Sequence, residues 1–108
     1  MSNSLIFDAL ALQKMASGHV CLDLSEQINW DVFPEFVEKV LKKFKGKIEK
    51  TIDTPCIRLW QVNITGCILN FVFDDFPVMV SLESSSDEGD ELLEKIYNEL
   101  SEKTHLIV

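Results

Sequence analysis

The sequence predicts a single α+β domain, spanning residues 1–108, in which a mainly antiparallel sheet of five or six strands carries two helices on one face. Three observations lead to this fold class. The chain has 108 residues, the usual size of one domain with one core. Short apolar runs separated by turn-forming residues fill its middle, as in an antiparallel meander. Two longer stretches, residues 33–44 and 87–102, instead repeat apolar residues at helical spacing.

The first two elements are predicted to form a β-hairpin. Residues 5–12 and 19–24 are strand-like, and the segment from Met15 to Gly18 between them contains a glycine that can adopt positive φ. The first run is also rich in helix-forming residues from Ala9 to Gln13, so its strand character stays open.

An amphipathic helix follows. Asn29 or Asp31 can cap its start, and Pro34 falls in the first turn, where a missing N–H costs little. Gly46 is expected to end the helix, and the lysines of its last two turns complement the helix dipole. Its apolar stripe consists of Phe33, Phe36, Val37, Val40, Leu41 and Phe44.

An antiparallel meander is predicted next, because three sets of turn-forming residues divide the apolar runs. Its strands are residues 47–52, 56–64, 67–74 and 78–83. The second helix then runs from Asp87 to about Glu102, with Ser85 and Glu88 at capping-box spacing. Residues 106–108 add a short strand or pack on the core. The side chains expected to be buried together are Phe36, Val40, Leu41, Leu69, Phe71, Val80, Leu82, Leu93 and Ile96.

The cysteines and the N-terminus indicate a cytoplasmic protein. Cys21, Cys56 and Cys67 each lie in an apolar, strand-like run, so we expect reduced, buried and unreactive thiols. The N-terminus lacks a basic segment, and Asp8 and Lys14 interrupt its apolar stretch, which argues against a signal peptide or a membrane span.

No set of residues typical of catalysis is present. His19 and His105 are not spaced from a Ser, Cys or carboxylate as nucleophile–base pairs are, and His19, beside a turn, is interpreted as a surface residue. No zinc-type Cys/His spacing and no glycine-rich phosphate loop occurs. We therefore expect a protein that is not an enzyme and uses neither a cofactor nor a metal.

The charge distribution points to a basic protein partner. With 18 acidic and 10 basic side chains the net charge is −8, which disfavours binding to nucleic acid. Residues 39–50 hold six lysines and one glutamate, whereas residues 74–102 hold ten acids and one lysine. Both segments could simply be solvated surfaces that complement their own helix dipoles. Alternatively, the acids form one rim that attracts a cationic protein.

The residues predicted to bind this partner are the acids of the rim and an aromatic anchor. Trp30 and Trp60 are the candidate anchors, with Trp60 preferred. The predicted set is Asp74, Asp75, Glu83, Asp87, Glu88, Asp90, Glu91 and Trp60.

The chain carries four motifs that allow a comparison: the run from Leu59 to Phe71, LWQVNITGCILNF, the segment from Val80 to Glu83, the pair Glu88-Gly89 ahead of an apolar helix, and the helix start Phe33-Pro34-Glu35. They are similar to motifs of a family of short gamma-proteobacterial proteins of unknown function. These motifs are structural, and the resemblance implies no catalytic residue.

In size, acidity and lack of a catalytic set, the chain also resembles by type the immunity proteins of bacterial contact-dependent growth inhibition, which bind and block a cognate toxin domain. The expected function is therefore a small acidic cytoplasmic binding protein that neutralises a toxin domain. The alternative is an uncharacterised housekeeping or adaptor domain. We expect binding to neither nucleic acid nor membrane.

Overall fold

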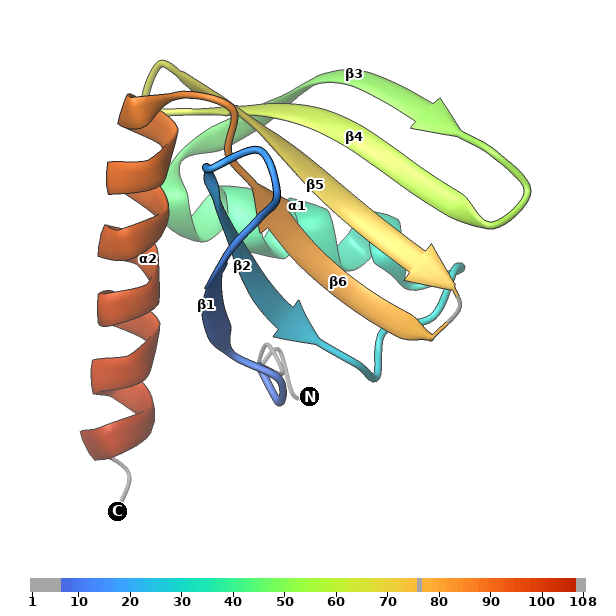
Figure 1. Ribbon diagram of the computed structural model, residues 1–108. Helices are drawn as coiled ribbons and strands as arrows, with labels where there is room; N and C mark the ends of the chain where they lie inside the picture. Colours follow the sequence, from blue (N-terminus) through green and yellow to red (C-terminus); the bar gives the residue numbers. More distant parts are fainter. Residues whose placement is uncertain (1–6, 76, 107–108) are drawn as a thin grey trace.

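The computed structural model of the chain describes residues 7–75 and 77–106, the last five of them by their backbone alone. The six strands form one antiparallel sheet in the order β1-β2-β6-β5-β4-β3 (Figure 1), so the α+β fold class is confirmed. In chain order the elements are β1 (Ala11–Lys14), β2 (Val20–Ser25), α1 (Phe33–Phe44), β3 (Gly46–Asp53), β4 (Ile57–Ile64), β5 (Cys67–Asp75), β6 (Val78–Glu83) and α2 (Asp87–Leu106).

Both helices pack on the same face of the sheet, as predicted. Side chains two residues apart on a strand share a face, so Leu69, Phe71 and Phe73 of β5 point the same way. The ring centroid of Phe33 in α1 lies 5.8 Å from those of Phe71 and Phe73. Leu69 packs against α2, since a Cβ built on Gly89 would stand 3.2 Å from it. In Figure 1, α1 lies behind the sheet and α2 stands at its left.

The core follows from the strand register. Trp60, Phe71, Leu82 and Leu22 lie directly opposite one another across β4, β5, β6 and β2, which gives one continuous apolar row. Phe33 is fully buried over this row. The whole set of core residues expected from the sequence is buried, so the phase of both helices and of β5 and β6 was predicted correctly.

The N-terminal hairpin is present, but its first strand is not residues 5–12. The strand that pairs with β2 is Ala11–Lys14, because the tight turn after it sets the register. In that turn the N–H of Met15 donates to the carbonyl of His19, and the N–H of Gly18 donates to the carbonyl of Met15. Residues 7–10 are not strand, and residues 5–6 lie outside the described residues.

The ends of α1 differ in part from the prediction. The N-cap residue is Val32, not Asn29 or Asp31, and it makes no side-chain cap hydrogen bond. Asn29 instead caps the turn before the helix, since its side-chain oxygen accepts a hydrogen bond of 2.9 Å from the N–H of Val32. The left-handed residue at the C-terminus is Lys45, with φ 60°, and not Gly46. Gly46 begins β3, where a Cβ would stand 2.8 Å from a side-chain carbon of Ile64. That glycine therefore permits close packing rather than a turn.

The last helix also begins with a different cap. The side-chain oxygen of Ser86, not Ser85, accepts a hydrogen bond of 3.0 Å from the N–H of Gly89. The helix extends to Leu106, past the predicted end at Glu102. Leu106 is therefore helical rather than part of a strand, and residues 107–108 lie outside the described residues.

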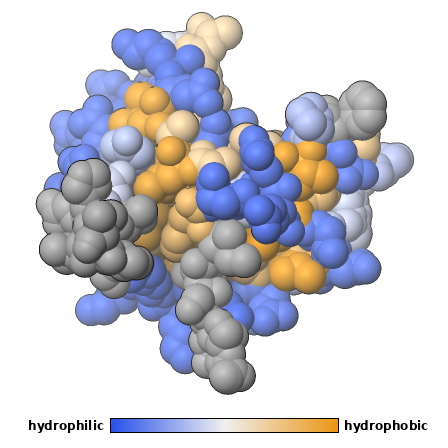
Figure 2. Space-filling view, turned by 90° about the horizontal axis from the view of Figure 1, so that it is seen from below, coloured by the Kyte–Doolittle hydropathy of each residue, from blue (hydrophilic) through white to orange (hydrophobic). Residues whose placement is uncertain are grey.

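The opposite face of the sheet carries no helix among the described residues. It presents an apolar row of Ile52, Leu59 and Val72 and, beyond Val72, the polar Ser81 and Asp23. Figure 2 views the molecule from below, at right angles to the view of Figure 1, and shows hydrophobic residues near the middle of this lower surface with hydrophilic residues around them. Within the part of the chain that the structure describes, no helix is long and apolar enough to cross a membrane.

We expect Leu69→Ala to lower the free energy of unfolding by about 2–5 kcal/mol, because it removes buried methyl groups and leaves a cavity beneath α2. Leu69 is 1% exposed. The adjacent Ile68, 39% exposed on the other face, is the matched control, and Ile68→Ala should cost less than about 1 kcal/mol. Chemical denaturation measures both losses. Equal losses would contradict the assignment of Leu69 to the helix-covered face.

Candidate functional site

The acidic residues expected to form one rim lie in separate groups. Asp74 and Asp75 end β5, whereas residues 87–91 begin α2. Cys67, the first residue of β5, and Glu88 line one cleft, which is described below. The start of α2 therefore lies beside the start of β5, whereas Asp74 and Asp75 are at the end of β5. The two ends of β5 are about 27 Å apart at about 3.4 Å per residue. A single rim is therefore not formed, and the group on α2 is the larger one.

Glu83 belongs to a third environment, on the uncovered face of the sheet. It pairs with Cys21 across β2 and β6 and shares this face with Asp23. Asp23 is 9% exposed and accepts hydrogen bonds from the Gln13 amide and the Cys21 thiol. Burial, and after it the charge of Asp23, raises the pKa of Glu83. Glu83 is thus part of a polar cluster on the sheet rather than of the α2 group.

Trp60 is not available as an aromatic anchor. It is 7% exposed, and its ring lies 5.2 Å from the Phe33 ring in an edge-to-face arrangement. Its indole N–H donates a hydrogen bond of 3.0 Å to Asp53. Trp30, the other candidate anchor, is only partly buried but packs edge-on against Phe73, 5.9 Å away. Both tryptophans therefore serve the core.

Arg58, which the sequence did not single out, connects these aromatic residues. Its guanidinium lies 4.6 Å from the ring centroid of Trp30 and 5.2 Å from that of Trp60. It donates to the backbone carbonyl of Trp30 and to both carboxylate oxygens of Asp53. Hydrogen bonds from Arg58 and then from Trp60 lower the pKa of Asp53. Arg58 thereby fixes the β3–β4 hairpin to the segment that precedes α1.

His19, interpreted from the sequence as a surface residue, is only partly exposed and is bonded to α2. Its Nδ1 lies 2.9 Å from a carboxylate oxygen of Asp90 in α2, and because an ionised carboxylate only accepts, Nδ1 carries the proton of this bond. The other oxygen of Asp90 accepts the backbone N–H of Val20 at 3.0 Å. The pKa of Asp90 is lowered to about 2, first by His19 and then by Val20. We call this pair of contacts the His19–Asp90 clamp.

The clamp also bears on metal binding. His19, Asp87 and Asp90 offer ligand atoms within 4.8 Å of one another. However, both oxygens of Asp90 already accept hydrogen bonds from the hairpin. The contacts present account for Asp90 as a link between α2 and β2. The partners are 71 residues apart, and no local pattern in the sequence signals the contact.

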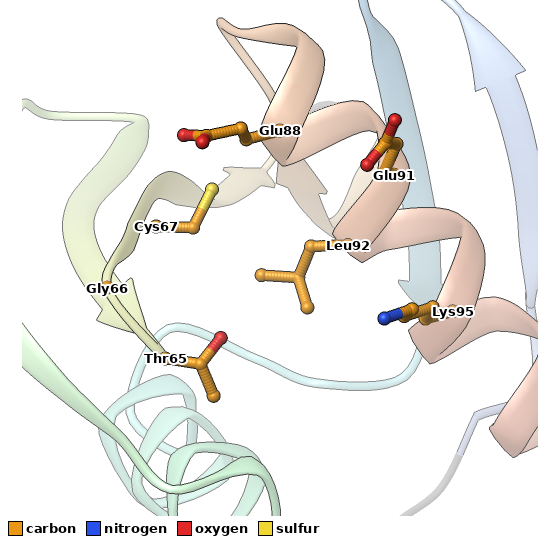
Figure 3. Close-up of a pocket in the computed structure, with 7 residues that line it drawn as sticks. All are labelled: Thr65, Gly66, Cys67, Glu88, Glu91, Leu92 and Lys95. Atoms are coloured by element: carbon orange, nitrogen blue, oxygen red, sulfur yellow. The ribbon is translucent and has the colours of Figure 1, made fainter.

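A cleft of about 270 Å³ lies between the β4–β5 turn and the first turns of α2 (Figure 3). Thr65, with a positive φ of 52°, and Gly66 shape the turn side. On the helix side, Glu88, Leu92 and Lys95 project toward the turn. Glu91 and Cys67 complete the lining. Of the predicted partner-binding residues, Glu88 and Glu91 are those that the structure brings together around a concave surface.

The three cysteines form no disulfide, but they are not uniformly buried as expected. Cys56 is exposed because β4 begins one residue later than predicted, which leaves Cys56 in the preceding turn. Cys67 is half-buried at the cleft. Cys21 is half-buried too, and burial is the largest of the effects that raise the pKa of its thiol to about 12.

Comparison with known proteins places the chain in a family without a known activity. Residues 10–101, most of the chain, match the model of a family described as "Protein of unknown function (DUF3630)". No curated protein and no solved structure shows significant similarity to the chain.

We expect the cysteines to react with iodoacetamide at pH 8 in the order Cys56, Cys67, Cys21. Cys56 is exposed, whereas the raised pKa of Cys21 leaves almost none of the reactive thiolate. Mass spectrometry of the alkylated peptides over time measures the order. If Cys21 were alkylated as fast as Cys56 in the native protein, its thiol would not be in the half-buried environment that raises its pKa.

We expect the His19–Asp90 clamp to make stability depend on pH in the acid range. The pKa of Asp90 falls from 3.8 to about 2 on folding, so its contribution is complete above about pH 4 and is lost as the pH falls toward 2. Asp90→Asn should therefore destabilise the protein at pH 6, and the difference from the unmodified chain should shrink steadily below pH 4. Urea denaturation at several pH values measures it. A difference independent of pH would exclude the charge of Asp90 as the cause.

Proposed function

The chain belongs to the DUF3630 family of proteins of unknown function, and we propose that it is a binding protein whose acidic α2 surface captures a basic protein. We define the acidic α2 surface as Asp87, Glu88, Glu91, Glu94 and Glu99. The specific form that we propose is an immunity-type inhibitor, which binds and neutralises a toxin domain in the cytoplasm.

The observation that carries this proposal is the unbalanced charge along α2. The helix holds seven acidic residues against two lysines. All five members of the acidic α2 surface are exposed, and among the described residues none forms an ion pair with a basic side chain. Their charge is therefore directed to solvent and is available to a partner.

The helix dipole alone does not explain this surface. Carboxylates stabilise the first turn of a helix, which accounts for Asp87 and Glu88, but the effect fades within that turn. Glu94 and Glu99 lie two and three turns further on, where the dipole gives no gain from a negative charge. The acidic α2 surface therefore extends beyond the first turn, where negative charge stabilises the helix. This extension favours a role in binding an external partner.

The physical advantage of such a surface suits an inhibitor. Charges of one sign steer an oppositely charged protein over about a Debye length, roughly 8 Å at physiological salt, and so raise the rate of encounter. An inhibitor must bind its target before the target acts, so a high association rate constant is more useful to it than a large contact area. The His19–Asp90 clamp supports this use because it holds the start of α2 against the hairpin.

A specific observation also favours the alternative, an adaptor domain. Ile52 and Ile68, on the uncovered side of the sheet, are 44% and 39% exposed. An adaptor would cover these side chains with a second protein, and its binding would depend on apolar contact rather than on α2.

The test begins with capture of the partner from the source cell on the immobilised chain and its identification by mass spectrometry. We expect a protein with a basic surface. The variant Asp87→Asn/Glu91→Gln/Glu94→Gln removes three charges from the acidic α2 surface and should slow association roughly threefold or more, with a weaker dependence on salt. Stopped-flow measurements at low and physiological salt determine both effects.

The matched control removes three charges elsewhere, by Glu26→Gln, Asp31→Asn and Glu38→Gln, all at exposed positions. It should leave association nearly unchanged, because the net charge is the same in both variants and only its location differs. Equal slowing in both variants would show that net charge, not the acidic α2 surface, directs binding. An association rate constant that does not change with salt concentration would overturn the proposed function.

A further inference from the structure

We propose that the cleft between the β4–β5 turn and α2 binds one arginine side chain of the partner, and so acts as the anchor point of the complex. This inference rests on the proposed function, because it names the group on the basic partner that the site recognises. It depends on the shape and the lining of the cleft rather than on the net charge of α2.

The cleft is large enough to admit one side chain. Its volume of about 270 Å³ lies below the roughly 300–1,000 Å³ of pockets that enclose drug-sized ligands. One wall is the backbone of the turn at Thr65 and Gly66, and the other is α2 (Figure 3). The turn is held in shape, since the N–H of Gly66 donates a 2.9 Å hydrogen bond to the Asn63 side chain. A partner side chain would therefore enter a preformed recess.

The lining has the chemistry that a guanidinium requires. The carboxylate of Glu88 extends from α2 over the cleft and can accept from a planar, five-donor group (Figure 3). Glu91, three residues further on, stays close to the helix and adds negative charge to the lining. Leu92 and the half-buried Cys67 supply apolar surface on which the aliphatic stem and the flat face of an arginine can pack. In Figure 3, Glu88 extends over Cys67 from the helix, which closes the upper end of the cleft.

Lys95 limits the cleft to one cation. Its ammonium lies at the lower end of the lining, two helical turns from Glu88, and it forms no ion pair with Glu88 or Glu91 among the described residues. A second cationic group at that end would be repelled. The cationic head of the partner's side chain is therefore directed toward Glu88 and Glu91. The cleft is thus negative at one end and positive at the other, unlike a uniformly acidic surface.

The experiment titrates the full ¹⁵N-labelled chain with N-acetyl-arginine amide and follows the backbone amide resonances. We expect saturable shifts concentrated on Thr65, Gly66, Cys67 and Glu88, in the millimolar range. N-acetyl-norleucine amide, a probe of similar length without charge, should produce much smaller shifts. Shifts spread evenly along α2, or equal shifts with both probes, would overturn the proposal.

Matched variants separate the cleft from the helix surface. Glu88→Gln/Glu91→Gln removes two charges from the cleft, whereas Glu94→Gln/Glu99→Gln removes two from exposed positions of the same helix outside it. The first variant should weaken probe binding roughly five- to tenfold and the second less than about twofold. All four positions are exposed, so the fold is expected to persist in both, and the amide spectrum verifies it. Equal weakening of probe binding in the two variants would show that the probe responds to the charge of α2 as a whole, and would overturn the proposal of a specific arginine cleft.

The same two variants distinguish this inference from the proposed function. If the captured basic protein associates more slowly with both variants and also dissociates from both at the same rate, the acidic α2 surface is correct and the arginine cleft is wrong, because the loss of an anchoring contact would speed dissociation from Glu88→Gln/Glu91→Gln alone. The opposite result is also possible, in which the arginine probe binds in the cleft but the association rate constant of the captured protein changes neither with salt nor in either variant. The cleft is then a guanidinium site and the proposed function is wrong.

Discussion

The rest of the structure depends on one apolar row that crosses four strands, with Phe33 buried over its centre. Leu22, Leu82, Phe71 and Trp60 face the same side because the antiparallel register places them directly opposite one another. A row of this kind must be covered, and α1 and α2 both cover it. Both helices pack on this side, so within the described part of the chain the other side of the sheet carries no helix, and α2 stands beside the β4–β5 turn.

The carboxylates at the start of α2 lie in two different environments. Asp90 points back to the hairpin, where both of its oxygens accept hydrogen bonds, and Gly89 allows the helix to approach Leu69. Glu88 and Glu91, on the cleft side, are exposed. A rigid attachment on one side of a helix keeps the charges on its other side in a fixed arrangement, which lowers the entropy lost when a partner binds.

Much of the fold could be predicted from the sequence because its signals are local. Turn residues mark the meander, and Phe33 to Phe44 repeat at helical spacing. The candidate site could be predicted only in part: the acids of α2 were recognised, but their separation from Asp74 and Asp75 depends on the direction of β5. Arg58 and His19 were missed because their partners lie far along the chain, up to 71 residues away. Alternation alone could have placed Trp60 inside, since it shares a face with Val62.

The position of Arg58 has an optical consequence. Trp30 and Trp60 are the two tryptophans of the chain, and both lie against the same guanidinium. The tryptophan fluorescence of the protein therefore originates from one corner, where the β3–β4 hairpin meets the segment before α1. Emission spectra report on the opening of that corner during unfolding, whereas the cleft residue Thr65 lies five residues beyond Trp60, about 17 Å at about 3.4 Å per residue, so a ligand there does not contact the Trp60 indole.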